Sequence, residues 1–194
     1  MKRVCLVAIA LAGWSGGAEA ASWTVDAAKS RLGFAGTAAG AGFEGAFERW
    51  RAEIAFDPAD PGAGRVAVSI ETASAKTGDL QKDGALPQPE WFDAAGHPEA
   101  RFEAAGFRAT GDHGYQAAGA LTLRGVTKPV TLPFRFEESA GGAGRFRGKI
   151  ELDRTEFGVG QGVWSGGQLV GTAVTVEFDL TAVGAGAVTR AGAP

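Results

Sequence analysis

The chain has 194 residues, a formal net charge of −3, two histidines and a single cysteine. Its basic residues are scattered and often stand beside acidic ones, as in Glu48-Arg49. The sequence therefore lacks the dense positive stripe that binding to nucleic-acid phosphates requires. Two isolated histidines do not supply the three or four convergent ligands of a zinc site, so we expect no bound metal ion.

The first twenty residues have the pattern of an export signal. Lys2 and Arg3 precede an apolar run over residues 4–11, and Ala18-Glu19-Ala20 offers a small-x-small cleavage site. The run is shorter than the ~20 apolar residues that span a bilayer. We expect residues 1–20 to be a signal peptide and the mature protein to lie in the periplasm. The cysteine, Cys5, lies in this leader, so we expect a mature domain without disulfides or thiolates.

Period-two alternation of apolar and polar residues is the main signal in the rest of the chain. Val66, Val68 and Ile70 alternate with smaller or polar residues. The same pattern predicts strands over residues 130–137, 145–153 and 174–181. A strand with one apolar and one solvated face is typical of an antiparallel sheet.

Weaker strand patterns fill the gaps between these segments. They cover residues 31–37, 50–56, 100–107 and 115–123, which makes eight strands, and Trp23-Thr24-Val25 is a candidate ninth. Phe47 is out of phase with Trp50, which predicts a bulge near Glu48, and the phase also changes before Phe107. Residues 124–129 are predicted to form a turn.

Two segments break the alternation. Residues 77–98 predict a short helix over 78–86, with Thr77 as its N-cap, followed by an irregular aromatic stretch. A glycine-rich loop over residues 155–169 carries Phe157 and Trp164. Residues 21–183 are therefore expected to form one all-β domain with a short helix, and residues 184–194 a disordered tail.

Eight strands with one apolar face each must bury that face against one another. The choices are a sandwich or a closed antiparallel barrel, and closure also removes exposed edges. An eight-stranded barrel is filled by side chains or holds one small ligand. Small residues at the inward positions 52, 104 and 148 leave room for a lumen, but they equally fit a tapered core.

Several motifs occur in a recognisable order. These are Trp23-Thr24-Val25-Asp26, Phe47-x-x-Trp50, Trp91-Phe92-Asp93, the stretch from Gly119 to Val130, and Asp153-Arg154-x-x-Phe157-Gly158. In these motifs the chain, from Trp23 to about Val183, resembles the YceI-like family of polyisoprenoid-binding proteins. The resemblance implies a lipocalin-like eight-stranded barrel that holds an isoprenoid chain, such as a quinone or a polyprenyl phosphate.

Three patterns that suggest catalysis have simpler explanations. Residues 40–45 match a dinucleotide fingerprint, but a strand follows where that motif needs a helix, so we expect a turn. Trp164-Ser165-Gly166 is similar to a nucleophile elbow, but Val163 stands where the first glycine belongs. Asp79 and Asp83 are paired carboxylates or, more simply, a solvated helix face. We expect no catalytic residue and no enzyme activity.

Large inward or loop side chains are the candidate ligand-binding residues. They are Phe34, Trp50, Trp91, Phe92, Phe102, Leu121, Leu132, Phe134, Phe157 and Trp164. For the strand members, ordinary core packing explains the pattern equally well. The loop members at positions 91, 92 and 164 favour a mouth or a lid.

The sequence thus predicts a periplasmic carrier for an isoprenoid lipid or quinone, with no cofactor other than this apolar ligand. One alternative is a solid-core barrel that acts as an interaction or stress-response module beside a membrane cytochrome. A hydrolase is the third hypothesis. A homodimer is compatible with each of them.

Overall fold

The computed structural model describes residues 20–139 and 142–185. The predicted leader, apart from Ala20, and the tail from residue 186 lie outside the described residues. The strands are β1 Ser22–Val25, β2 Arg31–Ala38, β3 Ala41–Phe47, β4 Trp50–Ala55, β5 Arg65–Glu71, β6 Ala75–Lys76, β7 Glu99–Gly111, β8 Gly114–Leu123, β9 Val126–Glu138, β10 Ala143–Asp153 and β11 Ala173–Gly184. The helix α1 covers Leu80–Ala85, and the short 3-10 helices are η1 Ala27–Lys29, η2 Pro61–Ala63, η3 Thr72–Ser74, η4 Arg154–Phe157 and η5 Gly162–Trp164.

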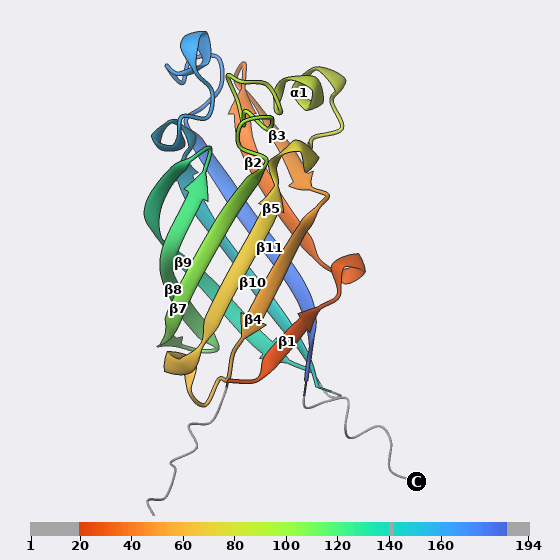
Figure 1. Ribbon diagram of the computed structural model, residues 1–194, viewed down its shortest axis with the longest axis vertical. Helices are drawn as coiled ribbons and strands as arrows, with labels where there is room; N and C mark the ends of the chain where they lie inside the picture. The colour runs from red at the N-terminus through yellow and green to blue at the C-terminus, as the bar shows by residue number, and fades with distance from the viewer. Residues whose placement is uncertain (1–19, 140–141, 186–194) are drawn as a thin grey trace, which may run out of the picture.

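All the strands belong to one antiparallel sheet that closes on itself. The consecutive strands β3 and β4 act as one bent strand of the wall, because β3 pairs with β2 on one side and β4 pairs with β5 on the other. The wall then runs through β2, β3 with β4, β5, β7, β8, β9, β10 and β11, and β11 pairs with β2. The predicted eight-stranded barrel is confirmed (Figure 1), and the sandwich is wrong because there is no second sheet among the described residues.

Both predicted phase changes are confirmed as irregularities of the wall. Between β3 and β4, the backbone N–H of Glu48 donates to the carbonyl of Ser74, and that of Arg49 donates to the Ser74 hydroxyl. In β7 the register shifts between Ala104 and Phe107, and Gly106 has a φ of +75°. Each extra residue lets the next apolar side chain point inward again.

Two predicted turns are placed differently. Residues 41–45 lie in β3, and the hairpin turn is formed by Ala39 and Gly40, both with positive φ. The turn after β8 consists of Arg124 and Gly125 alone, and residues 126–129 already belong to β9. Two-residue turns with positive φ at both positions match the twist of antiparallel strands, so the strands extend further than composition predicted.

Two boundaries also need correction. The helix begins at Leu80, and its N-cap is Asp79, whose carboxylate accepts hydrogen bonds from the N–H groups of Gln81 and Lys82. Thr77, the predicted N-cap, instead donates to the Asp83 carboxylate. At the other end of the domain, β11 continues to Gly184, where the tail was expected to begin.

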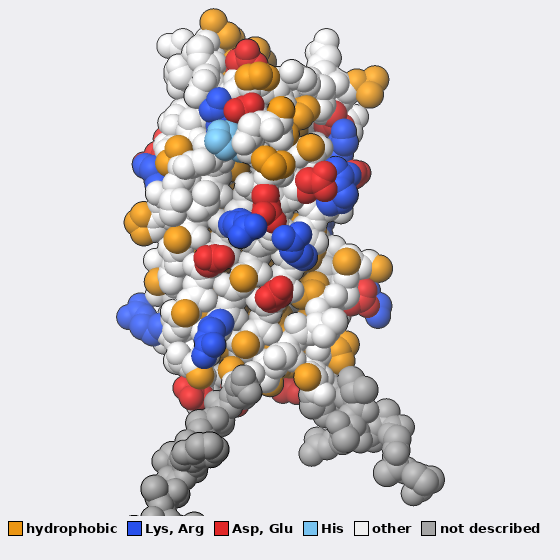
Figure 2. Space-filling model, in the orientation of Figure 1, with side chains coloured by type: hydrophobic (Ala, Val, Ile, Leu, Met, Phe, Trp, Pro, Cys, Tyr) orange, Lys and Arg blue, Asp and Glu red, His pale blue; other side chains and the backbone are white. Residues whose placement is uncertain are grey.

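Figure 1 shows α1 above one end of the barrel, here called the upper end, whereas the described chain begins and ends at the lower end. The short strand β1 closes the lower end because it pairs with both β4 and β11. On the front of the outer wall, positive and negative side chains lie side by side (Figure 2). The exposed ion pairs include one between Arg49 and Glu71.

Aromatic side chains fill the lower half of the barrel. Phe56 has no exposed surface, and its ring lies 4.9 Å from the ring of Tyr115 and 5.1 Å from that of Phe136, both edge to face. The indole N–H of Trp23 donates to the Phe56 carbonyl over 2.8 Å. This end of the barrel is therefore a solid aromatic core.

Replacing Phe56 with alanine should destabilise the protein by about 3–5 kcal/mol, because the closed lower end cannot collapse around the cavity that is left. Urea denaturation followed by tryptophan fluorescence measures the change. Leu80→Ala is the control, since Leu80 is 91% exposed and its loss should change stability by no more than ~0.5 kcal/mol. Equal effects of the two substitutions would contradict the solid core.

Candidate functional site: an apolar cavity in the upper half of the barrel

The inward side chains change from buried to half-exposed along single strands. On β9, Phe134 and Phe136 are buried, whereas Val130 and Leu132 are half-exposed. On β10, Phe146 is buried and the inward residues nearer the upper end are half-exposed. The exposure of these inward side chains comes from empty space inside the barrel.

This space is a cavity of about 220 Å³ whose lining runs from Trp91 and Phe92 near the upper end down to Phe107 and Phe146 of the aromatic core. It is larger than the ~150 Å³ apolar cavity that stays dry and binds benzene in another protein. Apart from one arginine and two glycines, its lining consists of apolar residues. Such a surface offers water almost no hydrogen bonds, so an apolar molecule is the occupant that it favours.

Nine of the ten predicted ligand-binding residues line the cavity. The exception is Trp164, whose ring packs against that of Trp91 with 5.7 Å between the centroids. A direct contact of any of the ten with a ligand stays a prediction. Other lining residues, such as Val68 and Ile150, follow from the same alternation, because every second residue of these strands points inward.

The small inward residues differ in what surrounds them. Ala52 borders the cavity. Ala104 belongs to the solid core, and a Cβ atom added to its cross-strand neighbour Gly119 would come within 2.7 Å of the Ala104 methyl group. A Cβ at Gly148 would lie 2.6 Å from the ring of Phe178. Of the three, Ala52 alone leaves space in the lumen.

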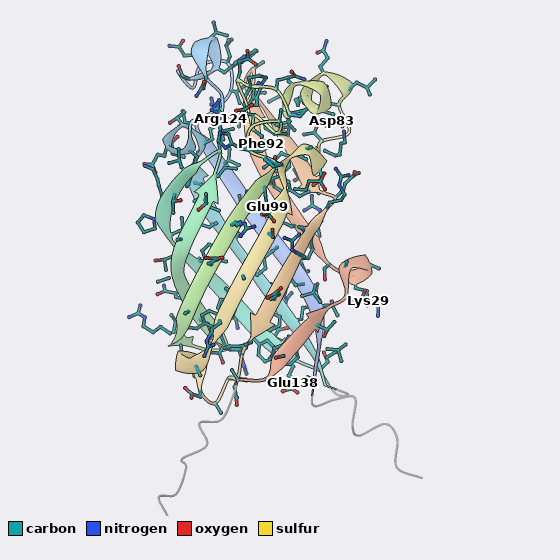
Figure 3. All side chains as sticks on the ribbon, in the orientation of Figure 1. Lys29, Asp83, Phe92, Glu99, Arg124 and Glu138 are labelled. Atoms are coloured by element: carbon teal, nitrogen blue, oxygen red, sulfur yellow. The ribbon has the colours of Figure 1, made fainter. Side chains whose placement is uncertain are left out.

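Two segments roof the cavity at the upper end, where Figure 3 labels Phe92 and Arg124. The first contains α1 and the aromatic stretch after it, and the second is the loop over residues 154–171. The ring of Phe92 lies 5.9 Å from that of Phe47, which in turn lies 5.2 Å from that of Phe34. Phe157 joins this cluster. The roof is therefore apolar on its inner side.

Arg154 holds the second segment in place. Its side chain is 5% exposed and donates hydrogen bonds of 2.5–3.3 Å to five backbone carbonyls. These carbonyls belong to Val159, Gly160, Trp164, Val170 and Gly171. The guanidinium group also lies 5.4 Å from the centre of the Trp91 ring. All five of its N–H donors are thus used within the protein.

Burial lowers the pKa of Arg154, but a guanidinium group keeps its proton in proteins. Sequence reasoning did not single out this residue, although it lines the cavity. An arginine at the end of a strand gives no local sign that five carbonyls of the following loop converge on it.

Arg124 connects the two roof segments. It donates to the carbonyl of Pro89 over 2.6 Å and to that of Gly158 over 3.2 Å. The backbone N–H groups of Gly160 and Gln161 also donate to the carbonyl of Glu90. The two segments therefore form one connected roof.

Within the described residues, no hydrogen bond links Ser165 to either histidine. The Ser165 hydroxyl donates to the carbonyl of Gly162, while His97 lies 3.7 Å from the Asp93 carboxylate. His113 occupies the hairpin turn between β7 and β8. Among residues 20–139 and 142–185, no three histidine, cysteine, aspartate or glutamate side chains are grouped as metal ligands.

The two helix carboxylates have separate structural roles. A hydrogen bond from the Lys82 side chain holds the pKa of Asp79 below its usual value. The pKa of Asp83 is lowered mainly by the backbone N–H of Thr77. Because each carboxylate is stabilised in its charged form by its own donors, the two do not share a proton.

A family model described as the YceI-like domain matches residues 23–182. The chain belongs to the YceI-like family. Two relatives are UPF0312 proteins, from Azotobacter vinelandii and from Pseudomonas syringae pv. tomato. The first is 31% identical over 138 residues, which cover 69% of this chain and 72% of the relative. The second is 31% identical over 143 residues, which cover 71% and 70%.

Solved structures share the fold of this YceI-like chain. Burkholderia cenocepacia BcnA has a TM-score of 0.78 at 30% identity, over 81% of this chain and 98% of that one. A polyisoprenoid binding domain from Saccharophagus degradans, implicated in plant cell wall breakdown, has a TM-score of 0.68 over 85% and 99%. At 17% identity the latter likeness shows the fold alone. In the described part of the chain, no helix has the length and apolar character needed to cross a membrane.

Replacing Arg154 with methionine should destabilise the protein by roughly 3 kcal/mol, since each buried carbonyl left without a donor costs ~1–3 kcal/mol and water can reach some of the five. The loop over residues 154–171 should also become the first site of proteolytic cleavage. Urea denaturation and limited proteolysis measure both effects. In the control Arg147→Met, which removes an exposed ion pair with Glu137, stability should change by less than ~1 kcal/mol. A protease-resistant Arg154→Met loop would contradict this role.

Proposed function

We propose that this protein binds an isoprenoid lipid or an isoprenoid quinone in its barrel and carries it through the periplasm. The observation that carries the proposal is the contrast between the two halves of one barrel. Side chains fill the lower end around Trp23 and Phe56, while above this core the barrel keeps a roofed apolar cavity. A barrel that served only as a solid interaction module would not need this space, because an unfilled apolar cavity lowers stability.

Burial of an apolar chain supplies the binding energy. Each buried CH₂ group contributes about 0.8 kcal/mol, so fifteen such groups give roughly 12 kcal/mol before costs. Association and ordering cost about 4–15 kcal/mol. The single charged residue of the lining, Arg154, has its donors engaged by carbonyls. The cavity therefore recognises the tail of the ligand, and a quinone or polyprenyl phosphate head group stays outside the apolar lining.

The comparisons support the class of ligand. The Saccharophagus degradans neighbour is described as a polyisoprenoid binding domain, and a barrel of the same fold with an apolar lumen suits the same kind of chain. We extend this ligand class to the present protein. The dispersed serine and histidine groups support a binding role over the hydrolase hypothesis.

Organic extraction of purified protein, followed by mass spectrometry, tests the proposal directly. We expect an isoprenoid lipid or quinone in the extract and a matching extra mass in the native spectrum. A protein that carries no lipid and takes up none from isoprenoid-containing vesicles would contradict the carrier function. That result would favour the interaction module, whose membrane cytochrome partner or homodimer could then be sought by cross-linking.

A matched pair of substitutions tests the position of the binding site. Ala52→Phe should reduce binding of an isoprenoid alcohol strongly at little cost in stability, because the new ring enters the cavity. Ala104→Phe should overpack the solid core and cost about 1–3 kcal/mol. Calorimetric titration and urea denaturation of delipidated protein measure the two properties. A strongly destabilised Ala52→Phe variant, or unchanged binding by it, would contradict a lumen at this position.

We also propose that residues 1–20 direct export and are removed. N-terminal sequencing of protein from the periplasmic fraction should begin at Ala21. An Ala18→Arg substitution should block cleavage, since the site requires small residues, while the control Ser22→Thr should leave it unchanged. Recovery of the wild-type protein with Met1 intact would contradict the proposal.

A further inference from the structure

The barrel wall is incompletely paired between β9 and β10. Their backbone pairing runs from Glu138 and Gly144 to Phe134 and Gly148 and ends there. Beyond that point β9 stays paired with β8 as far as Val126, and β10 stays paired with β11. Residues 129–133 of β9 and 149–153 of β10 thus lack mutual pairing, and we call the space between them the slit.

Two prolines explain why the pairing stops. The N–H of Phe136 donates to the His113 carbonyl on the β8 side, and the N–H of Ser139 donates to Ala143 on the β10 side. Because successive N–H groups of a strand point to opposite neighbours, the odd-numbered residues of β9 point toward β10. Pro129 and Pro133 occupy odd positions and have no N–H. The next bond of the β9–β10 ladder, from residue 133, therefore cannot form.

The slit leads into the cavity. Leu132 on its β9 side and Ile150 on its β10 side both line the cavity, as do Val130 and Leu152 further up. On the outside, an open groove reaches the lower end of the slit, where Pro133 and Lys149 line it. The slit extends over roughly 13 Å, at ~3.3 Å per residue.

One exposed ion pair bridges the upper end of the slit. The Lys128 ammonium group of β9 lies 3.2 Å from the carboxylate of Glu156, which follows β10. Their side chains are 36% and 55% exposed, and such surface pairs are weak. The roof, in contrast, is held by five hydrogen bonds from the buried residue Arg154 and by two from Arg124. Widening the slit therefore costs less than lifting the roof.

We propose that the slit is the site where an apolar chain enters and leaves the cavity, sideways between β9 and β10. Pro129 and Pro133 keep the wall from pairing there, and the Lys128–Glu156 ion pair clasps the upper end. This entry site rests on the proposed carrier function, since it presupposes an apolar chain in the cavity.

Restoring the missing donors tests the role of the prolines. In the double variant Pro129→Thr/Pro133→Thr, the hydrogen-bond ladder between β9 and β10 can extend past Phe134. The backbone N–H of Thr131, which points toward β10, should then become protected from hydrogen exchange. Protein loaded with geranylgeraniol, an isoprenoid alcohol, should then release it to phosphatidylcholine vesicles about ten-fold more slowly, with unchanged equilibrium affinity. Pro58→Thr, in the exposed turn after β4, is the control and should release at the wild-type rate. Protection of Thr131 without slower release would overturn the proposal.

Cross-linking the clasp gives an independent test that does not require the ladder to extend. In a Cys5→Ser background, Lys128→Cys/Glu156→Cys joined by a short bismaleimide should release geranylgeraniol about ten-fold more slowly than the same variant without the linker. The control is Arg49→Cys/Glu71→Cys, which links residues of an exposed ion pair directly beside the paired strands β4 and β5. A cross-linked clasp with unchanged release would overturn the entry site.

The two proposals fail in different ways. Wild-type protein that never binds geranylgeraniol at equilibrium contradicts the carrier function. Wild-type protein that binds it, and exchanges it equally fast with the slit open or closed, keeps the carrier function and contradicts only the entry through the slit.

Discussion

The volume of the inward side chains is the constraint on which the rest of this structure depends. A closed sheet can bury its apolar face only against itself, and an eight-stranded barrel is just wide enough for large side chains to meet across it. At the lower end Phe56, Phe136 and Phe146 meet in this way, and Phe146 also lines the cavity above them. Above them phenylalanine, valine, leucine and isoleucine side chains together line the wall without filling the centre, which leaves the cavity.

The lower end of the barrel therefore stabilises the fold, and the upper end provides the space for binding. The aromatic core and the indole hydrogen bond of Trp23 anchor the lower end, so the upper end can stay hollow without loss of the fold. Its roof is stabilised by polar bonds in addition to packing, since Arg154 satisfies five carbonyls of a largely irregular loop. A buried charge is tolerated there because every donor is paired.

Much of this arrangement could be predicted from residue order. Alternation identified the strands and their inward faces, and the six candidate residues on strands border the cavity because the side-chain period of a strand is two. The phase of Phe47 against Trp50 located the break between β3 and β4. Trp164 lies against Trp91 outside the lining, and a glycine-rich loop has no period from which the direction of a side chain follows.

The sequence by itself determined the all-β class, the inward residues and the positions of the two prolines, since each depends on local sterics or on a fixed period. Only the tertiary structure decided that Ala52 borders empty space and Ala104 does not, because filling depends on residues contributed by several distant strands. It also decided that Pro133 faces β10, since the direction of an N–H group depends on the register with both neighbours. Packing and register each depend on at least two segments of the chain, so neither can be predicted from the residues of one segment.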